Sequence, residues 1–396
     1  MYSKIFFSTL VLAAALTSCS DVVHYDDDAK DVFAADGAPV INAVYDISDT
    51  EGAAPLEGAS LNQMIRVAGK NLSHVREITF NGIPVDVSQV YATSENSYIK
   101  IPRVIPENVT NELVYTTELG TTRRSFEVTI PSLRLEGLAN EFCRAGESVQ
   151  VNGDYFDLFG FGQEGSDAHI TLNGTELKID SITETYMSIV IPEDTPDNSL
   201  IDFSWKEVGD KACSKKVPFR YKQYIFMPDL TTVGWWDATV KKYITDGSKA
   251  GDPASSYGNF FRITGHFDQW SWNSFGGGFN WPQLDCRANP QDYVFKFEVC
   301  SSASNPFYDS EEWGYLFGLN DADPISWNPS VGVSYNTYGE WRTISIPLDK
   351  VASKGLPDPN AESPWCNFVM VLQPNSNGGW DVDHSFANFR VEPAEF

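Results

Sequence analysis

Tryptophan gathers in the C-terminal half of the chain, where it alternates with small polar residues. Ten of the 11 tryptophans lie between Trp235 and Trp380. Three stretches are typical of this mixture: GWWD at 234–237, QWSWN at 269–273 and NWPQ at 280–283. Buried strands are dominated by apolar side chains, so a mixture of Trp with Asn, Gln and Gly predicts aromatic loops at the surface.

An indole ring in such a loop can bind an uncharged sugar. Its face carries the negative end of a quadrupole, which suits the C–H face of a pyranose ring. Neighbouring polar side chains then bond the hydroxyl groups and orient the sugar. Because Trp270 and Trp272 are two residues apart, a strand would place both on one side, as a platform for adjacent sugars. The candidate ligand-binding residues are Trp235, Trp236, Trp270, Trp272, Trp281 and Trp313.

Other tryptophans have a structural interpretation. Trp341 opens a strand and Trp365 precedes a Val-rich strand, so both are expected to be structural, and Trp205 is expected in a core. Trp327 and Trp380, like Trp313, lie in loops rich in Gly, Asn and Pro, where the pattern does not decide between core and surface.

A glycoside hydrolase is the alternative function. It would need two facing carboxylates, one of them kept protonated. The candidate pairs are Glu311 with Glu312, Asp321 with Asp323, and Asp381 with Asp383. All three pairs lie near Gly, Pro or Asn, which predicts solvated turns, and the chain has no nucleophile elbow, zinc-protease motif or Walker loop. We therefore expect no enzyme and no catalytic residue, with Glu311 and Asp323 as the first residues to test for the alternative.

No cofactor is expected. Asp381 with Asp383, or Asp321 with Asp323, would supply hard oxygen ligands for a structural calcium, against the simpler interpretation of charged loops. The cysteines form no CxxC pair, so a zinc site is not expected. We expect buried free thiols at Cys143, Cys213, Cys286, Cys300 and Cys366.

Composition narrows the class of ligand. The 396 residues include 54 acidic and 28 basic side chains, a formal charge of −26. Such a surface repels nucleic acid and anionic lipid, so we expect a neutral partner and no nucleic acid. Apolar residues make up 42% of the chain, which is enough to build hydrophobic cores.

The first 18 residues have the pattern of a signal peptide. Lys4 precedes a short apolar run, and Leu16-Thr17-Ser18-Cys19 resembles a bacterial lipobox, in which Cys19 is lipidated. Residues 19–37 are acidic and are expected to form a flexible tether. Within it, Ser20, Asp21 and Asp26-Asp27-Asp28 resemble the export signal of Bacteroidetes surface lipoproteins. The resemblance implies a lipid-anchored outer-membrane protein that faces the cell exterior, with a periplasmic orientation as the alternative.

The middle of the chain contains an internal repeat of short strands. Gly69, Asn81-Gly82 and Ile101-Pro102 recur as Gly153, Asn173-Gly174 and Ile191-Pro192. Asn-Gly between strands indicates a tight hairpin. Residues 38–131 and 132–220 resemble the IPT/TIG branch of immunoglobulin-like domains, which implies two spacer sandwiches. Residues 221–396, with strands expected at 293–299, 341–346, 368–372 and 389–391, predict a larger jelly-roll-like sandwich, so the whole chain is all-β.

Together these features resemble the surface glycan-binding proteins of Bacteroidetes, and the C-terminal region resembles the glycan-binding domain of their "B" type. The matching segments are 234–236, 259–265, 270–272 and 386–391. The resemblance implies a non-catalytic protein that captures a neutral polysaccharide, such as β-1,3-glucan, mixed-linkage glucan or xyloglucan. It also implies an outer-membrane glycan importer and surface glycoside hydrolases as partners. A further alternative is an adhesin or assembly protein that binds a protein through its IPT-like domains.

Overall fold

A computed structural model describes residues 31–281, 284–309, 313–329 and 332–396. These residues form antiparallel strands with short turns, so the expected all-β class is confirmed. No helix in these ranges combines the length and the apolar character that a membrane crossing requires. The expected signal peptide, Cys19 and the tether up to residue 30 lie outside the described residues. The short helices are η1 (Val87–Gln89), η2 (Phe156–Leu158), η3 (Ala238–Tyr243), η4 (Pro290–Asp292) and α1 (Leu348–Val351).

The first sandwich is a compact unit made of the described residues 31–102 and 111–128. Its sheets have the strand orders β1-β3-β7-β6, β5-β4-β8-β9 and β10-β2. Residues 31–37, expected in the flexible tether, are instead bonded to this sandwich, because Ser73 Oγ donates to Phe33 O and Ser94 N donates to Val32 O. The strands are β1 (Val40–Asp46), β2 (Gly58–Ser60), β3 (Met64–Lys70), β4 (Val75–Phe80), β5 (Ile83–Pro84), β6 (Tyr91–Ala92), β7 (Asn96–Lys100), β8 (Glu112–Thr117), β9 (Gly120–Ser125) and β10 (Glu127–Thr129).

The second sandwich repeats the strand order of the first, with sheets β11-β12-β16-β15 and β14-β13-β17-β18. Its core includes Phe156, Phe203 and Trp205. The strands are β11 (Arg134–Leu138), β12 (Ser148–Asp154), β13 (His169–Leu172), β14 (Thr175–Glu176), β15 (Ile179–Ile182), β16 (Tyr186–Val190), β17 (Ser199–Glu207) and β18 (Lys211–Phe219).

The residues of the repeat have the same local role in both sandwiches. Asn81 and Gly82 have φ of 49° and 79°, and Asn173 and Gly174 have φ of 51° and 79°, as a type I′ hairpin turn requires. Gly69 and Gly153 each pass so close to the neighbouring strand that a Cβ would overlap a carbonyl oxygen, of Val40 and Arg134 respectively. The two copies of the repeat therefore share their backbone geometry as well as their residue types.

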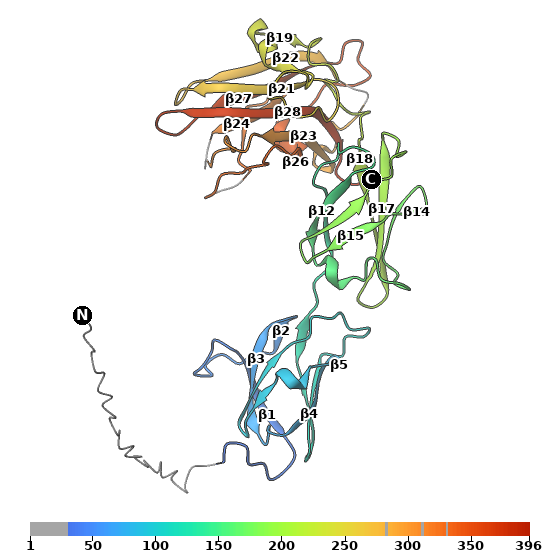
Figure 1. Cartoon of the computed structure of the whole chain (residues 1–396), viewed down its shortest axis with the longest axis vertical. Coiled ribbons are helices and arrows are strands. Elements are labelled where there is room, and N and C mark those ends of the chain that lie inside the picture. The colour runs from blue at the N-terminus through green and yellow to red at the C-terminus, as the bar shows by residue number, and fades with distance from the viewer. Residues whose placement is uncertain (1–30, 282–283, 310–312, 330–331) are drawn as a thin grey trace, which may run out of the picture. The chain divides into compact units, whose positions relative to one another are not determined.

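The third sandwich consists of two five-stranded sheets, β19-β22-β27-β24-β25 and β20-β21-β28-β23-β26 (Figure 1). Aromatic side chains from both sheets fill the core between them, such as Phe275 and Phe368 from one and Phe261, Phe295 and Phe389 from the other. The strands are β19 (Gly234–Trp235), β20 (Ile244–Thr245), β21 (Phe260–Phe267), β22 (Asn273–Asn280), β23 (Tyr293–Ser301), β24 (Gly314–Leu319), β25 (Ile325–Trp327), β26 (Arg342–Pro347), β27 (Trp365–Gln373) and β28 (Trp380–Pro393).

The second and third sandwiches form one compact unit, residues 129–396 with 103–110. A cluster of buried charges joins them. Glu141, from the second sandwich, accepts hydrogen bonds of 2.6 Å from Arg390 Nη2 and from Lys296 Nζ of the third. The same Arg390 contacts Glu298 and Glu392, which are fully buried.

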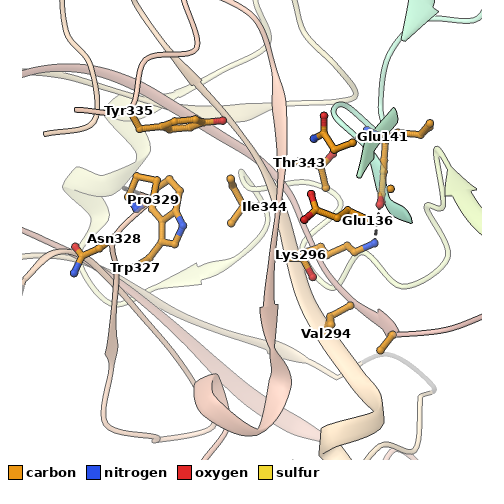
Figure 2. A pocket seen from close by; sticks show the side chains of 15 residues that line it. Glu136, Glu141, Val294, Lys296, Trp327, Asn328, Pro329, Tyr335, Thr343 and Ile344 are labelled. Atoms are coloured by element: carbon orange, nitrogen blue, oxygen red, sulfur yellow. Dashed lines mark hydrogen bonds and ion pairs between the residues drawn. The ribbon is translucent and has the colours of Figure 1, made fainter. Parts of the chain in front are cut away.

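A cavity of about 660 Å³ lies beside this cluster. Figure 2 shows that Trp327, Pro329 and Tyr335 lie on one side of the cavity and Glu136, Lys296 and Thr343 on the other. The backbone joins the sandwiches here as well, since Thr343 N donates to Ala139 O and Glu141 N donates to Thr343 Oγ1.

The five described cysteines are free thiols, as expected, but the expected burial is confirmed at only four of them. Cys143, Cys286, Cys300 and Cys366 are buried, whereas Cys213 is half-buried. The cores therefore hold together without a disulfide among these residues.

Candidate functional site

Three consecutive glycines, Gly276–Gly278, occupy the middle of β22, and each lies against a tryptophan. A Cβ at Gly276 would overlap the indole of Trp236, and one at Gly278 would overlap the indole of Trp365. A Cβ at Gly277 would lie 2.8 Å from Cε3 of Trp235. The glycine run is therefore a seat for aromatic rings rather than a flexible loop.

The alternation of the strand decides which of these rings face outward. Phe275 and Phe279 belong to the core, so Gly277 faces the core with them. Gly276 and Gly278 consequently face the outer side of the sheet. Trp236 reaches Gly276 from the β19 side, where the backbone N–H of Trp236 donates to Gly276 O. Trp365 reaches Gly278 from the other neighbouring strand, β27.

Four exposed tryptophans lie on this sheet or in the loops next to it. The exposed fraction is 60% for Trp236, 53% for Trp270, 55% for Trp272 and 55% for Trp365. Trp272 immediately precedes Asn273, the first residue of β22, and Trp365 covers Gly278 near the other end of that strand. Five steps of extended chain span about 17 Å, so the row is longer than a single sugar ring. We call these four residues the aromatic row.

Trp270 and Trp272 lie in the loop before β22, which differs from the expected strand. Trp270 has a φ of 61°, a left-handed conformation that turns the chain. The loop is fixed by hydrogen bonds: Trp270 N donates to Pro374 O at 2.8 Å, and Asn273 Nδ2 donates to Leu372 O at 3.1 Å. The rings are therefore held on a rigid turn rather than on one strand face.

Trp235 and Trp281, both expected to contact the ligand, lie in the core instead. Trp235 is 9% exposed, its Nε1 donates to Leu230 O, and its ring packs edge-on against Phe261. Trp281 is 3% exposed and its Nε1 donates to Leu284 O. Both N–H groups are satisfied inside the protein, so neither ring face is open to a ligand, and we leave both residues out of the aromatic row.

Trp313 is half-buried at the border of the row. Its ring centroid lies 6.2 Å from that of Trp270, at an interplanar angle of 89°. This edge-to-face contact supports the Trp270 ring from one side.

Trp365 is the residue that the sequence interpretation missed. It was expected to be structural, but its position at the first residue of β27 leaves more than half of it in solvent. The available signal was the glycine run, because a strand without side chains on its outer face leaves room for rings from both neighbours. The expectations for Trp205 and Trp341 are confirmed, since both are buried, and Trp327 and Trp380 are buried too.

The four described carboxylates of the candidate pairs each have a polar or charged partner. Asp381 and Asp383 lie within β28, not in the expected turn; Asp383 accepts two hydrogen bonds from Arg262, and Asp381 Oδ1 lies 2.9 Å from His266 Nδ1. Asp321 accepts from Asn367 Nδ2 at 2.6 Å, and Asp323 is exposed beside Lys354.

Glu311 and Glu312 lie outside the described residues. Within the described ranges, no group of three or more His, Cys, Asp and Glu side chains is placed to hold a metal ion.

Two carboxyl groups with raised pKa lie on the other sheet. Burial raises the pKa of Glu298 to about 7, and burial also raises the pKa of Glu392. Phe295 and Phe297 of β23 point into the core, so Glu298 between Phe297 and Val299 points to the outer face of its own sheet, away from the aromatic row. These groups serve the junction of the sandwiches.

The fold and the site define an all-β protein whose C-terminal sandwich presents a row of tryptophans on one sheet. Residues 219–393 match the family model described as the surface glycan-binding protein B xyloglucan binding domain. The match confirms the resemblance inferred for the C-terminal region. No curated protein sequence matches the chain.

The solved structures to which this chain is similar include two that are described as a surface glycan-binding protein or as SGBP-B. The surface glycan-binding protein PbSGBP-B from Prevotella bryantii is 21% identical, over 91% of this chain and 100% of that chain, with a TM-score of 0.47. SGBP-B from a complex xyloglucan utilization locus in Bacteroides uniformis is 14% identical, over 90% of this chain and 99% of that chain, with a TM-score of 0.46.

A third structure contains a ligand. SGBP-B from the mixed-linkage glucan utilization locus of Bacteroides ovatus, solved with a mixed-linkage heptasaccharide, is 15% identical. The match covers 85% of this chain and 72% of that chain, with a TM-score of 0.27.

Proposed function

We propose that this protein binds a neutral polysaccharide, a β-glucan, on the aromatic row of its third sandwich and does not hydrolyse it. The observation that carries the proposal is the seating of Trp236 and Trp365 over bare glycines, with Trp270 and Trp272 on a fixed turn beside them. Rings held in this way stack on sugar faces without first losing conformational freedom. Ser274 and Asn280 are exposed on the same face of β22 and can bond hydroxyl groups.

The charge of the site favours an uncharged ligand. Asp237 follows Trp236 and Asp268 precedes Trp270 by two residues, and both carboxylates lie at the surface. A hydrogen bond from the backbone of Thr239 lowers the pKa of Asp237, so this group stays ionised at neutral pH. A polymer of uronic acids or sulfated sugars would be repelled.

The cellular role follows the sequence and the family description. As a lipoprotein anchored through Cys19, the chain would display the sandwich at the outer membrane, with residues 38–131 and 132–220 as IPT-like spacers. A glycan importer and surface glycoside hydrolases are the proposed partners. An open row buries little of each sugar, so we expect micromolar or weaker affinity at a single site.

Affinity gel electrophoresis of residues 20–396 tests the proposal. The gels would contain β-1,3-glucan, mixed-linkage glucan, xyloglucan, mannan or xylan. Retardation by a β-glucan is expected, and Trp236→Ala, Trp270→Ala and Trp272→Ala should each weaken binding about tenfold, the loss of one stacking contact.

The matched control is Tyr338→Ala, which removes a ring that is 74% exposed but lies on the loop before Trp341. This variant should bind as the wild type does. Circular dichroism would show that each variant is folded. Absence of retardation in every gel, or retardation that none of the three tryptophan variants reduces, would remove the proposal in favour of a protein partner. Shortening of the polysaccharide would establish the hydrolase instead.

A further inference from the structure

Trp365 continues the row beyond Trp236. The two rings cover Gly278 and Gly276, which lie two residues apart on the outer face of β22. Two strand residues span about 7 Å, so the two rings are neighbours along β22. Trp365 lies toward the end of β22 that is remote from Trp272.

A hollow of about 340 Å³ adjoins Trp365 at this end of the strand. Its wall includes Gly278, Asn280, Thr232 and Asp229. The side chain of Asn280 makes no hydrogen bond with any part of the chain that the structure describes, so its amide is free for a ligand. Aromatic surface next to unengaged polar groups is the composition of a saccharide subsite.

The carboxylate in the hollow is fixed and charged. Asp229 Oδ1 accepts hydrogen bonds from Thr231 Oγ1 at 2.7 Å and from Asn259 Nδ2 at 2.6 Å. These bonds lower the pKa of Asp229. An ionised carboxylate accepts hydrogen bonds from sugar hydroxyls and repels an anionic sugar.

From these observations, and resting on the proposed function, we infer that Trp365 and the adjoining hollow form an additional subsite. It takes an uncharged sugar unit of a chain that already lies across Trp272 and Trp236. The affinity of the site therefore depends on the length of the glucan. A short oligosaccharide contacts Trp236 and Trp272, and only a longer one also reaches Trp365.

Isothermal titration calorimetry with a ladder of mixed-linkage β-glucan oligosaccharides, from the disaccharide to the octasaccharide, tests the inference. Wild-type affinity should rise with length. Trp365→Ala should lower the affinity for the longest oligosaccharides about tenfold and leave that for the shortest bound ones unchanged. Trp365→Phe should retain most of the gain, and Asn280→Ala should lose part of it.

The outcomes separate this inference from the proposed function. If Trp272→Ala weakens binding at every length while Trp365→Ala weakens it at none, the row is a glucan site and the additional subsite is wrong. An equal loss at all lengths in Trp365→Ala would also overturn it, because the residue would then serve the site as a whole. If the wild type binds neither the oligosaccharides nor any polysaccharide of the panel, the proposed function itself fails.

Discussion

Arg390 Nη2 donates to Oε2 of Glu141 at 2.6 Å, although 249 positions separate the two residues in the chain. Arg390 is fully buried and Glu141 is 3% exposed. The pair belongs to a cluster of three carboxylates, Glu141, Glu298 and Glu392, and two cations, Arg390 and Lys296. Because every member needs its partners inside the protein, the second and third sandwiches are tied together by charge.

Removal of Glu141 should loosen that tie. Glu141→Ala leaves the buried Arg390 Nη2 without a carboxylate and leaves Lys296 Nζ with Glu392 alone, which we expect to lower the free energy of unfolding by about 3 kcal/mol. Calorimetry should then resolve separate transitions for the two sandwiches. Glu141→Gln keeps an acceptor oxygen and should show a smaller loss, whereas a single unchanged transition in Glu141→Ala would contradict the role of the cluster.

Glu298, another carboxyl group of this cluster, makes the stability of the protein depend on pH. Burial raises the pKa of Glu298 to about 7 from an ordinary 4.5, so the folded state holds a proton that the unfolded state releases between these values. The free energy of unfolding should therefore fall as pH rises from 4.5 through 7, by on the order of 3 kcal/mol.

Glu298→Gln mimics the protonated group and provides the test. Denaturant titrations should find the variant close to the wild type at pH 5 and more stable than the wild type at pH 8. Parallel pH profiles for the two proteins would count against a proton on Glu298. Polysaccharide binding should be the same in both, because Glu298 lies on the other sheet.

Adjacent glycines should have opposite effects. Gly276→Ala pushes on the exposed ring of Trp236, so we expect about tenfold weaker glucan binding and little change in stability. Gly277→Ala places a Cβ 2.8 Å from Trp235 and 3.0 Å from Val233 in the core, which should cost about 1–3 kcal/mol of stability. Equal effects of both variants on binding and on stability would refute the assignment of faces.

The neighbouring tryptophans Trp235 and Trp236 should also differ in their effects on stability and binding. Trp235→Ala empties a core position and should lower the free energy of unfolding by about 3–5 kcal/mol. Trp236→Ala removes a ring that is 60% exposed and should change stability by under 1 kcal/mol, roughly the range for surface positions, while weakening binding. Urea unfolding and affinity gels on the two variants would check this; a stable Trp235→Ala that fails to bind glucan would return Trp235 to the site.

Local patterns in the sequence predicted the fold well. Asn81-Gly82 and Asn173-Gly174 predicted their hairpins because positive φ at two successive residues restricts both residue type and turn. The strand expected at 293–299 lies within β23, since alternating Phe and Lys on a half-buried sheet leaves a clear signature.

The site was less predictable, because neighbouring tryptophans can differ in burial through strand alternation alone. Trp235 and Trp236 differ by one residue, and only the pairing with Gly277 and Gly276 decides which of them faces the core. Trp365 gains its role from a strand that is remote in sequence. The junction was not visible either, since Glu141 and Arg390 meet only through tertiary packing.

The buried cysteine thiols can be used to measure local opening of the second and third sandwiches. Desolvation raises the pKa of Cys143, Cys286 and Cys366 to about 12 and that of Cys300 to about 11. Thiol reagents attack the thiolate, so each of these groups is silent while its sandwich is closed. The rate at which a thiol reagent labels Cys143 therefore measures how often the second sandwich opens. The rates at Cys286, Cys300 and Cys366 measure the same for the third sandwich, without an engineered cysteine in either.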